Sequence, residues 1–409
     1  MSKFTKLIKH PVLFFKDAIN KPVPNKPVPK KPVPKKPVPK KPVPINRDEY
    51  NYNKFELYSH LLHTGEDITG LSHLDLWLPH FIKADVNFVV MVRNYELFQI
   101  IVEKYPQLTI TFAKVDKDVG YYLDQLVFLK ACFYPSNTGR NMHLLKFNKI
   151  KHIFIGHGDS DKTASAHKYF RVYDENWVAG KAHIDRFVNE GFDFSGLESV
   201  EVGRPNLKET LEISKISWEN RFDGQLNLLY LSTWEGVYQE QNYTSVYMIE
   251  EFFNKNLIEF DHLKIKLHPW VGRRDKSLEN FASTLDELLS LKGVDYTIYD
   301  KTTPVEELIK QSNIFICDIS AVISESLAAN GPIFVYIPKD KDIKLTKSKM
   351  SYADYTYTFS TLDELIEQIE DVIINKNDYL AKRREEAMEY ILGRDETLAD
   401  TFIEKLKGI

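Results

Sequence analysis

The residues from 152 to 162 read HIFIGHGDSDK and pass from an apolar run into a tight polar turn. A strand is predicted over 152–156, and ligands of open α/β sheets bind beyond the carboxyl ends of strands. Gly156 and Gly158 permit a tight turn and a close approach of the backbone to a ligand. His157 is then presented at a cleft, where an imidazole with an ordinary pKa near 6.5 suits general-base work on a hydroxyl. The alternative is a turn histidine that hydrogen-bonds only to backbone.

Small polar and charged residues follow this turn. Ser160, Lys162 and Ser165 supply hydrogen-bond donors for phosphate oxygens. Asp159 and Asp161 suggest a metal ion, but the segment lacks supporting carboxylates, and the sequence has no zinc-like Cys/His spacing and no Walker A motif. We therefore expect a phosphate-handling site that uses no metal and no cofactor.

A second histidine stands at the end of another predicted strand, in KIKLHPW at 264–270. Pro269 cannot continue a central strand, so the chain must leave the sheet at this point. His268 is thereby fixed at the carboxyl edge, where it can bind a diphosphate; a loop-capping histidine is the alternative. Thr233 and Trp234 follow the first strand of the same half and are expected to line the cleft.

A third segment, NIFICDISAVISESLAANGP at 313–332, predicts a strand, a turn and a helix. The strand ends at Asp318, and a helix capped by Ser320 is expected to follow. The unpaired amides at a helix start form a generic phosphate cradle. Glu325 is either a ribose ligand or a solvated helix residue. TTPVEEL at 302–308 predicts a plain helix start with Thr303 as its cap.

Short β-rich runs alternate with helical patterns from residue 46 onwards, which is typical of βα units and parallel sheets. The predicted strands are 86–92, 108–113, 126–133, 152–156, 176–179, 226–232, 263–267, 294–299, 313–317 and 332–337, and examples of the predicted helices are 244–255, 277–291, 304–311 and 321–329. The fold class is α/β, with two Rossmann-like αβα domains that face a cleft. They span 46–205 and 226–409, with C-terminal helices in the second and a polar linker at 206–225.

The first 45 residues differ from the rest in charge. They hold twelve Lys and one Asp, so they carry +11 and the remainder carries −15 of the overall −4. Residues 1–20 form a basic segment, and the apolar residues and lysines within 3–19 suit an amphipathic helix on an anionic membrane. A helix docked on the body and disorder are the alternatives. Residues 21–45 are five KPVPx repeats, which predict a polyproline II spacer.

Composition limits the compartment and the partners. Hydrophobic residues make up 43% of the 409 residues, enough for sizeable cores. Cys132 and Cys317 lie in apolar runs and indicate neither a disulfide framework nor a metal site, so a reducing compartment is expected. No apolar stretch is long enough to span a bilayer, and Lys6, Lys9, His10 and Pro11 interrupt any signal-peptide core. We expect a cytoplasmic protein, peripheral on the inner face of the membrane, that binds no nucleic acid.

These segments, in this order, resemble the CDP-glycerol glycerophosphotransferase family, which builds teichoic acids and the polyol-phosphate polymers of some bacterial capsules. The similarity lies in GHGDSDKTAS (156–165), YDENWVAG (173–180), VGRPN (202–206), LSTW (231–234), KLHP (266–269) and CDISAVISE (317–325). Two positions depart from the family pattern. The family's HGT is HGD here, and its paired serines are Ser320 and Ala321.

The resemblance implies a GT-B fold with an N-terminal acceptor domain and a C-terminal nucleotide-donor domain. His157 resembles the histidine that acts on the acceptor hydroxyl, and His268 the histidine that contacts the donor diphosphate. Residues similar to those that contact the donor's phosphates and nucleotide are Thr233, Asp318, Ser320 and Ala321. The implied reaction transfers glycerol phosphate or ribitol phosphate from CDP-glycerol or CDP-ribitol to a hydroxyl of a growing cell-surface polymer or lipid-linked glycan, and it releases CMP.

Two other functions are compatible with these residues. A GT-B glycosyltransferase of capsule or lipopolysaccharide synthesis would use a nucleotide sugar on the same architecture. A non-catalytic scaffold of a capsule assembly complex, tethered by the KPVPx spacer, would need no reaction at all.

Overall fold

The computed structural model describes residues 57–161, 165–191, 193–239, 242–255, 260–301, 303–341, 343, 345–393 and 398–409. The predicted basic segment at 1–20 and the spacer at 21–45 lie outside these residues, as does Lys162. Among the helices of the described ranges, none combines the length and the apolar character that crossing a bilayer requires.

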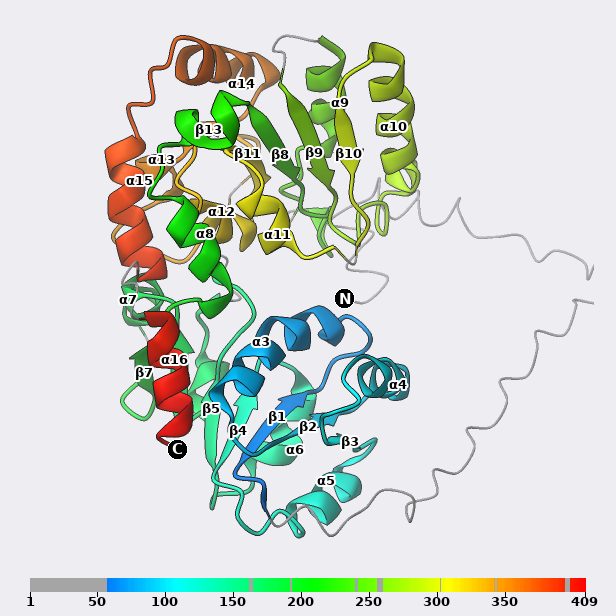
Figure 1. The fold of residues 1–409 in the computed structure, drawn as a ribbon, viewed down its shortest axis with the longest axis vertical. Coiled ribbons are helices and arrows are strands. Elements are labelled where there is room, and N and C mark those ends of the chain that lie inside the picture. Colours follow the sequence, from blue (N-terminus) through cyan, green and yellow to red (C-terminus); the bar gives the residue numbers. More distant parts are fainter. Residues whose placement is uncertain are drawn as a thin grey trace, which may run out of the picture. The chain divides into compact units, whose positions relative to one another are not determined.

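The described residues form two parallel sheets with helices between their strands (Figure 1). The first has seven strands in the order β3 (Ile110–Phe112), β2 (Phe88–Val92), β1 (His60–Thr64), β4 (Ala131–Tyr134), β5 (Lys151–Phe154), β6 (Glu175–Val178) and β7 (Glu198–Glu201). The second has six, in the order β10 (Tyr296–Ile298), β9 (His262–Lys266), β8 (Asn227–Leu231), β11 (Ile314–Asp318), β12 (Ile333–Tyr336) and β13 (Tyr357–Phe359). Every neighbouring pair is parallel, so the carboxyl ends of the strands meet at one edge of each sheet.

Helices connect these strands. Those of the first half are α3 (Gly70–Ala84), α4 (Tyr95–Lys104), α5 (Asp116–Leu123), α6 (Met142–Leu145) and α7 (Lys181–Asn189). Those that follow are α8 (Lys208–Ile213), α9 (Val246–Lys255), α10 (Phe281–Lys292), α11 (Val305–Lys310), α12 (Val322–Leu327), α13 (Tyr352–Tyr355), α14 (Leu362–Ile369), α15 (Ala381–Ala387) and α16 (Leu398–Lys407). Short π-helical turns, η10 (Glu370–Ile374) and η11 (Met388–Leu392), extend α14 and α15.

Central strands are buried along their whole length, because helices cover both faces of each sheet. β8 and β11, for example, consist entirely of buried residues. This explains why continuous apolar runs in the sequence predicted strands well. All ten predicted strands overlap a strand of the structure, and the four predicted helices given above overlap helices.

Three strands were not predicted. β1 contains His60 and His63, which are buried yet break the apolar run that identifies a central strand. β7 is an edge strand with the sequence ESVE, and its charged residues face solvent. β13 has only three residues. The unpredicted β1 matters most, because it occupies the centre of the first sheet.

Two other predictions need correction. The segment at 206–225 was expected to be a polar linker, but it contains α8 and buries Leu207 and Trp218. The predicted second domain, 226–409, includes α16, whose Phe402 and Leu406 lie in the core of the first sheet. The ring of Phe402 stacks on Trp77 of α3, with 4.9 Å between the ring centroids. Figure 1 shows α16 in red beside α3 in blue.

Candidate functional site

The turn after β5 requires glycine for a conformational reason. Gly156 has φ +64°, a left-handed conformation that residues with a Cβ rarely adopt. Its carbonyl oxygen accepts a hydrogen bond of 2.6 Å from Trp77 Nε1, which fixes the turn to α3. As a result the chain leaves the buried strand sharply, and the next side chain, His157, is exposed to solvent.

His157 is held in a defined tautomer. Its Nδ1 lies 2.8 Å from the carbonyl oxygen of Pro135, the residue after β4. A carbonyl only accepts hydrogen bonds, so Nδ1 carries the proton and Nε2 of the neutral ring has a free lone pair. Displacement of water by the surrounding protein and, to a smaller extent, repulsion from His73 lower the pKa of His157 to about 4, although solvent still reaches the side chain. At neutral pH the ring is therefore uncharged, in the form that accepts a proton.

A second histidine lies against the first. The ring of His73, on α3, is parallel to that of His157 within 10°, with 3.6 Å between the centroids. Nδ1 of His73 lies 2.7 Å from Oε2 of Glu66, a residue just past the end of β1. The strands β1, β4 and β5 are neighbours, so their carboxyl ends bring Glu66, Pro135 and His157 together. Glu66 and His73 are not among the predicted site residues, because β1 has no continuous apolar run that would identify it as a strand.

The turn around His157 is in contact with the second half of the chain. A Cβ placed on Gly158 would lie 2.9 Å from the Cβ of Ala321 and 3.7 Å from Oε1 of Glu325. The segment at 156–158 and the turn at 318–321 therefore lie side by side, as predicted. Both Ala321 and Glu325 are partly exposed there.

Asp318, at the end of β11, was predicted to contact the donor, but in the structure its carboxylate is buried and hydrogen-bonded within the protein. It is fully buried, and its carboxylate accepts three hydrogen bonds, from Thr233 N at 2.8 Å, Thr244 Oγ1 at 3.0 Å and Ser245 N at 3.0 Å. Burial raises its pKa to about 6. These three donors occupy the carboxylate, so the structure gives no support to the prediction that Asp318 contacts a donor phosphate. Asp318 instead fixes the loop after β8, and Thr233 is itself buried.

The predicted helix cap is also corrected. α12 begins at Val322 with Ala321 as its N-cap, and Ser320 Oγ donates to the carbonyl oxygen of Asp318 at 3.1 Å. Ser320 therefore stabilises the turn and does not cap the helix. The helix at 305–310 likewise starts one residue later than predicted, with Pro304 and not Thr303 at the N-cap.

His268 lies in a cluster of aromatic side chains after β9. Its backbone N donates to Ser232 Oγ at 3.0 Å, which joins it to the loop after the neighbouring strand β8. Its Nδ1 accepts a hydrogen bond of 3.1 Å from Trp270 N, so Nε2 of the neutral ring carries the proton and is a donor. The ring lies near Trp234 and Trp270, at centroid distances of 6.3 and 6.0 Å. The guanidinium of Arg273 lies 4.4 Å from the centre of the Trp270 ring.

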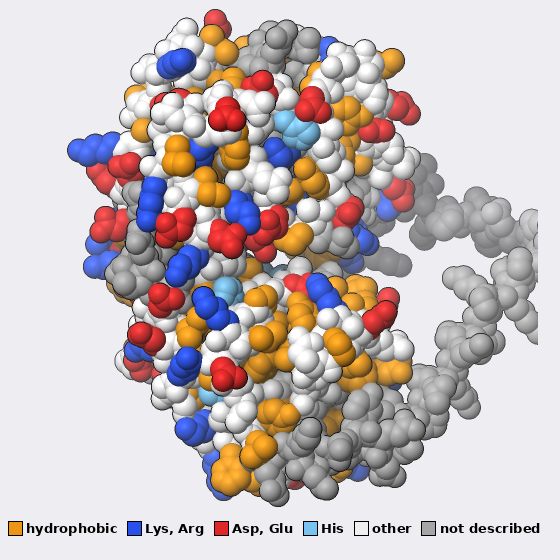
Figure 2. All heavy atoms as spheres, viewed as in Figure 1, with side chains coloured by type: hydrophobic (Ala, Val, Ile, Leu, Met, Phe, Trp, Pro, Cys, Tyr) orange, Lys and Arg blue, Asp and Glu red, His pale blue; other side chains and the backbone are white. Residues whose placement is uncertain are grey.

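Charged residues of the two halves act on each other across the junction between them. Hydrogen bonds from Thr69 lower the pKa of Asp67, next to Glu66, and the charge of Arg273 adds to this effect. Burial raises the pKa of Glu306, on α11, and Asp75 on α3 adds to it. On the face drawn in Figure 2, acidic and basic side chains lie on both sides of this junction. Charged residues beside both histidine clusters therefore interact, since Asp67 adjoins Glu66 and Arg273 packs on Trp270 near His268.

Glu325 stands at the same junction. Burial and repulsion from Glu306 raise its pKa to about 8, while Arg204 opposes the shift. Arg204 is buried and donates from Nη1 to the carbonyl oxygen of Ile155 at 3.2 Å. At neutral pH the carboxyl group of Glu325 is therefore largely protonated and can donate a hydrogen bond.

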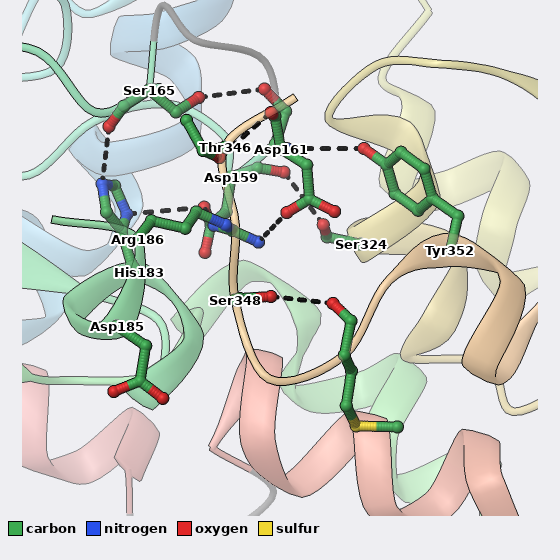
Figure 3. A network of polar contacts seen from close by, with 12 residues as sticks. Asp159, Asp161, Ser165, His183, Asp185, Arg186, Ser324, Thr346, Ser348 and Tyr352 are labelled. Atoms are coloured by element: carbon green, nitrogen blue, oxygen red, sulfur yellow. Dashed lines mark hydrogen bonds and ion pairs between the residues drawn. The ribbon is translucent and has the colours of Figure 1, made fainter. Parts of the chain in front are cut away.

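The acidic residues that follow His157 belong to a buried ion-pair network (Figure 3). Arg186, on α7, pairs with Asp159 through Nη1 and with Asp161 through Nη2, the latter at 2.6 Å. His183 Nδ1 lies 3.4 Å from Asp159 Oδ1. Ser160 Oγ hydrogen-bonds to Ser165 Oγ at 2.9 Å, within the same segment. The departure from the family pattern at Asp159 thus has a structural explanation, since its carboxylate is paired with Arg186.

This network also fastens the two halves together. Ser324 Oγ, on α12, donates to the carbonyl oxygen of Asp159 at 2.9 Å, and Thr346 N donates to that of Asp161 at 2.7 Å. Within the described part of the chain, no group of three or more His, Cys, Asp and Glu side chains is arranged to hold a metal ion.

No family model matches the chain, and no curated protein matches it in sequence. Among solved structures, a variant of the wall teichoic acid polymerase TagF is similar with a TM-score of 0.56 at 13% identity, covering 87% of this chain and 91% of the other. A glycosyltransferase from Rickettsia africae is similar with a TM-score of 0.51 at 11% identity, covering 86% and 98%. Anabaena HepE, in complex with UDP and glucose, is similar with a TM-score of 0.50 at 10% identity, covering 86% of this chain and 99% of the other. The fold is therefore the predicted GT-B-like arrangement, shared with a teichoic acid polymerase and with glycosyltransferases.

Proposed function

We propose that this chain transfers glycerol phosphate, or ribitol phosphate, from a CDP-linked donor to a hydroxyl of a growing cell-surface polymer or lipid-linked glycan. The observation that carries the proposal is the state of His157: an exposed, neutral imidazole with a free Nε2, beside the turn at 318–321 of the other half. The fold shared with TagF, which has been soaked with CDPG, supports a nucleotide-linked donor.

The reaction follows from the two tautomers. The acceptor hydroxyl gives its proton to Nε2 of His157 as its oxygen attacks the phosphorus that carries the polyol. A new oxygen–phosphorus bond forms, and the bond from that phosphorus to the CMP oxygen breaks, so CMP leaves. His268 donates from Nε2 to the diphosphate and stabilises the charge that develops there. The mechanism assigns no step to a metal ion, since Asp159 and Asp161 are paired with Arg186.

Other residues have supporting roles in this proposal. Trp234 lies beside His268 and lines the donor side, and Ser320, Ala321 and Glu325 lie where the donor meets the first half. Gly156 lets the chain turn sharply towards the site, and Gly158 lets this turn pack closely against Ala321. Asp318 and Thr233 act indirectly, because they fix the loops that carry these groups. Residues 3–19 hold the enzyme at the inner face of the membrane, where a lipid-linked acceptor is found.

The test is a transfer assay with CDP-glycerol and CDP-ribitol on the wild-type chain and on His157→Ala. Wild type is expected to release CMP only in the presence of an acceptor. The variant is expected to lose transfer by about 100-fold or more, while CDP-glycerol still raises its melting temperature. Wild-type turnover in the variant would remove His157 from the mechanism.

A nucleotide-sugar glycosyltransferase is the second candidate, favoured by the shared fold with HepE and the Rickettsia africae enzyme. Product analysis separates the two. A phosphodiester between polyol and acceptor supports the proposal, whereas a glycosidic bond formed from a nucleotide sugar supports the second candidate.

A further inference from the structure

Glu66, His73 and His157 form one stacked and hydrogen-bonded group. The rings of His73 and His157 are 3.6 Å apart and nearly parallel, and Glu66 Oε2 lies 2.7 Å from His73 Nδ1. A carboxylate accepts, so Nδ1 of His73 donates, and the plane of that ring is fixed by Glu66. Thr64 Oγ1 donates to the same Oε2 at 3.2 Å and holds the carboxylate in turn.

The three side chains differ in their access to solvent. The side chains of His73 and Glu66 are 22% and 17% exposed, whereas His157 is more open to solvent. His157 is therefore the member best placed to touch a substrate. His73 lies behind it and presents a ring face, not an open edge, to its partner.

Neighbouring charged residues shift the pKa of His157 in opposite directions. Burial is the main cause of its low pKa; His73 and Arg204 lower it further, and the carboxylate of Glu66 opposes them. Burial opposes ionisation of Glu66, but the hydrogen bond from His73 and the charges of His73 and His157 when protonated lower its pKa. Glu66 is thus the nearby negative charge that favours a proton on His157.

Resting on the proposed function, we propose that Glu66 and His73 are positioning residues for His157. His73 holds the plane of the His157 ring by stacking, and Glu66 stabilises the imidazolium that forms when Nε2 takes the acceptor's proton. The proton stays on His157 until product leaves, and Glu66 remains ionised throughout. Neither residue contacts the donor.

The test uses Glu66→Gln, which keeps the size of the side chain and removes its charge. Its first readout needs no substrate: histidine-selective NMR of the full chain follows the titration of His157, identified by the resonance lost in His157→Gln. Removing the opposing charge is expected to move the titration of His157 to lower pH. The second readout is transfer kinetics, where kcat is expected to fall roughly threefold to tenfold, because a weaker base accepts a proton less readily, while KM for the donor is unchanged.

His73→Phe provides a second variant in case Glu66→Gln does not fold. It keeps an aromatic ring against His157 but breaks the link to Glu66, so kcat is again expected to fall without a change in donor KM. His80→Phe is the matched control, because His80 lies on the same helix and contacts Trp77 and Phe402 instead. It should leave both readouts unchanged.

The outcomes separate the two proposals. A His157 titration that stays in place or moves to higher pH in Glu66→Gln overturns the inference, whether or not transfer is observed. A wild-type chain that transfers no polyol phosphate from any CDP donor overturns the proposed function, and the titration alone then decides whether Glu66 sets the charge of His157.

Discussion

Gly158 faces Ala321 across the contact between the two halves, with room for only one Cβ between them. A Cβ on Gly158 would come within 2.9 Å of that of Ala321, closer than real Cβ atoms approach. Neither atom can rotate away, so the backbone itself must shift. The contact sits one residue from His157 and therefore couples the spacing of the halves to the position of that ring.

Gly158→Ala is expected to lower transfer by roughly tenfold or more, because displacement of a reacting group by a fraction of an ångström weakens catalysis steeply. The double variant Gly158→Ala/Ala321→Gly returns the missing space and should recover most of the activity. Gly120→Ala is the control, since nothing lies within 4 Å of a Cβ there. Kinetic assays of the three variants check this. If the double variant stays as slow as the single one, steric contact with Ala321 is not the cause.

Arg186→Met should destabilise the protein strongly. Asp159, Asp161 and Arg186 are buried, with 1%, 4% and 1% of their surface exposed. Loss of the guanidinium therefore leaves two buried carboxylates without their cationic partner. Breaking a buried pair of this kind costs about 3–5 kcal/mol of unfolding free energy. Urea denaturation measures the change.

Arg383→Met is the matched control for that experiment. Arg383 pairs with Glu386 on the surface, and its side chain is 45% exposed, so its loss should cost less than about 1 kcal/mol. Equal losses in the two variants would contradict a special role for the buried network.

Glu325→Gln should change how stability depends on pH. Burial raises the pKa of Glu325 from 4.5 to about 8. Because the folded-state pKa is the higher one, the stabilisation from the protonated group is complete below pH 4.5 and is lost as the pH rises through about 8. Above that pH the variant should be more stable than the wild type. Melting temperatures measured across this range test the sign, and the exposed Glu367→Gln serves as control.

His268→Gln should weaken donor binding by about tenfold or more, because a hydrogen bond to a charged phosphate contributes roughly 1.5–3 kcal/mol. Calorimetric titration with CDP-glycerol measures the affinity. His262→Gln is the control, since His262 lies at the opposite end of β9 and pairs with Asp295. An unchanged affinity in His268→Gln would place the diphosphate elsewhere.

The fold could be predicted from the sequence because strands buried on both faces of a parallel sheet consist of consecutive apolar residues. The sequence also predicted the proximity of the turn at 156–158 to the turn at 318–321, since each follows the carboxyl end of a strand and the two domains were expected to face a common cleft with these ends. It did not predict β1, because the buried His60 and His63 resemble polar positions. Burial of His60 is tolerated because its Nε2 donates to the carbonyl oxygen of Leu406, a partner 346 residues away that no local pattern reveals.

The candidate site was predicted only in part for the same reason. Single residues after a strand, such as His157 and His268, carry a local signal. The roles of Asp318 and Asp159 depend on which donors the fold brings to them, namely Thr233, Ser245 and Arg186. Glu66 follows the end of β1 in the same way that His157 follows β5. It would therefore be a candidate site residue if β1 could be recognised from the sequence.

The position of α16 bears on the order of events during synthesis. Phe402 and Leu406 complete the core around Trp77, so the half of the protein made first lacks part of its interior until α16 has been translated. The half that is translated later contains its own sheet, and it can complete that sheet before α16 completes the core of the first half. Nascent chains of this protein should therefore expose the apolar side chains around Trp77 to chaperones until α16 emerges from the ribosome and packs against α3.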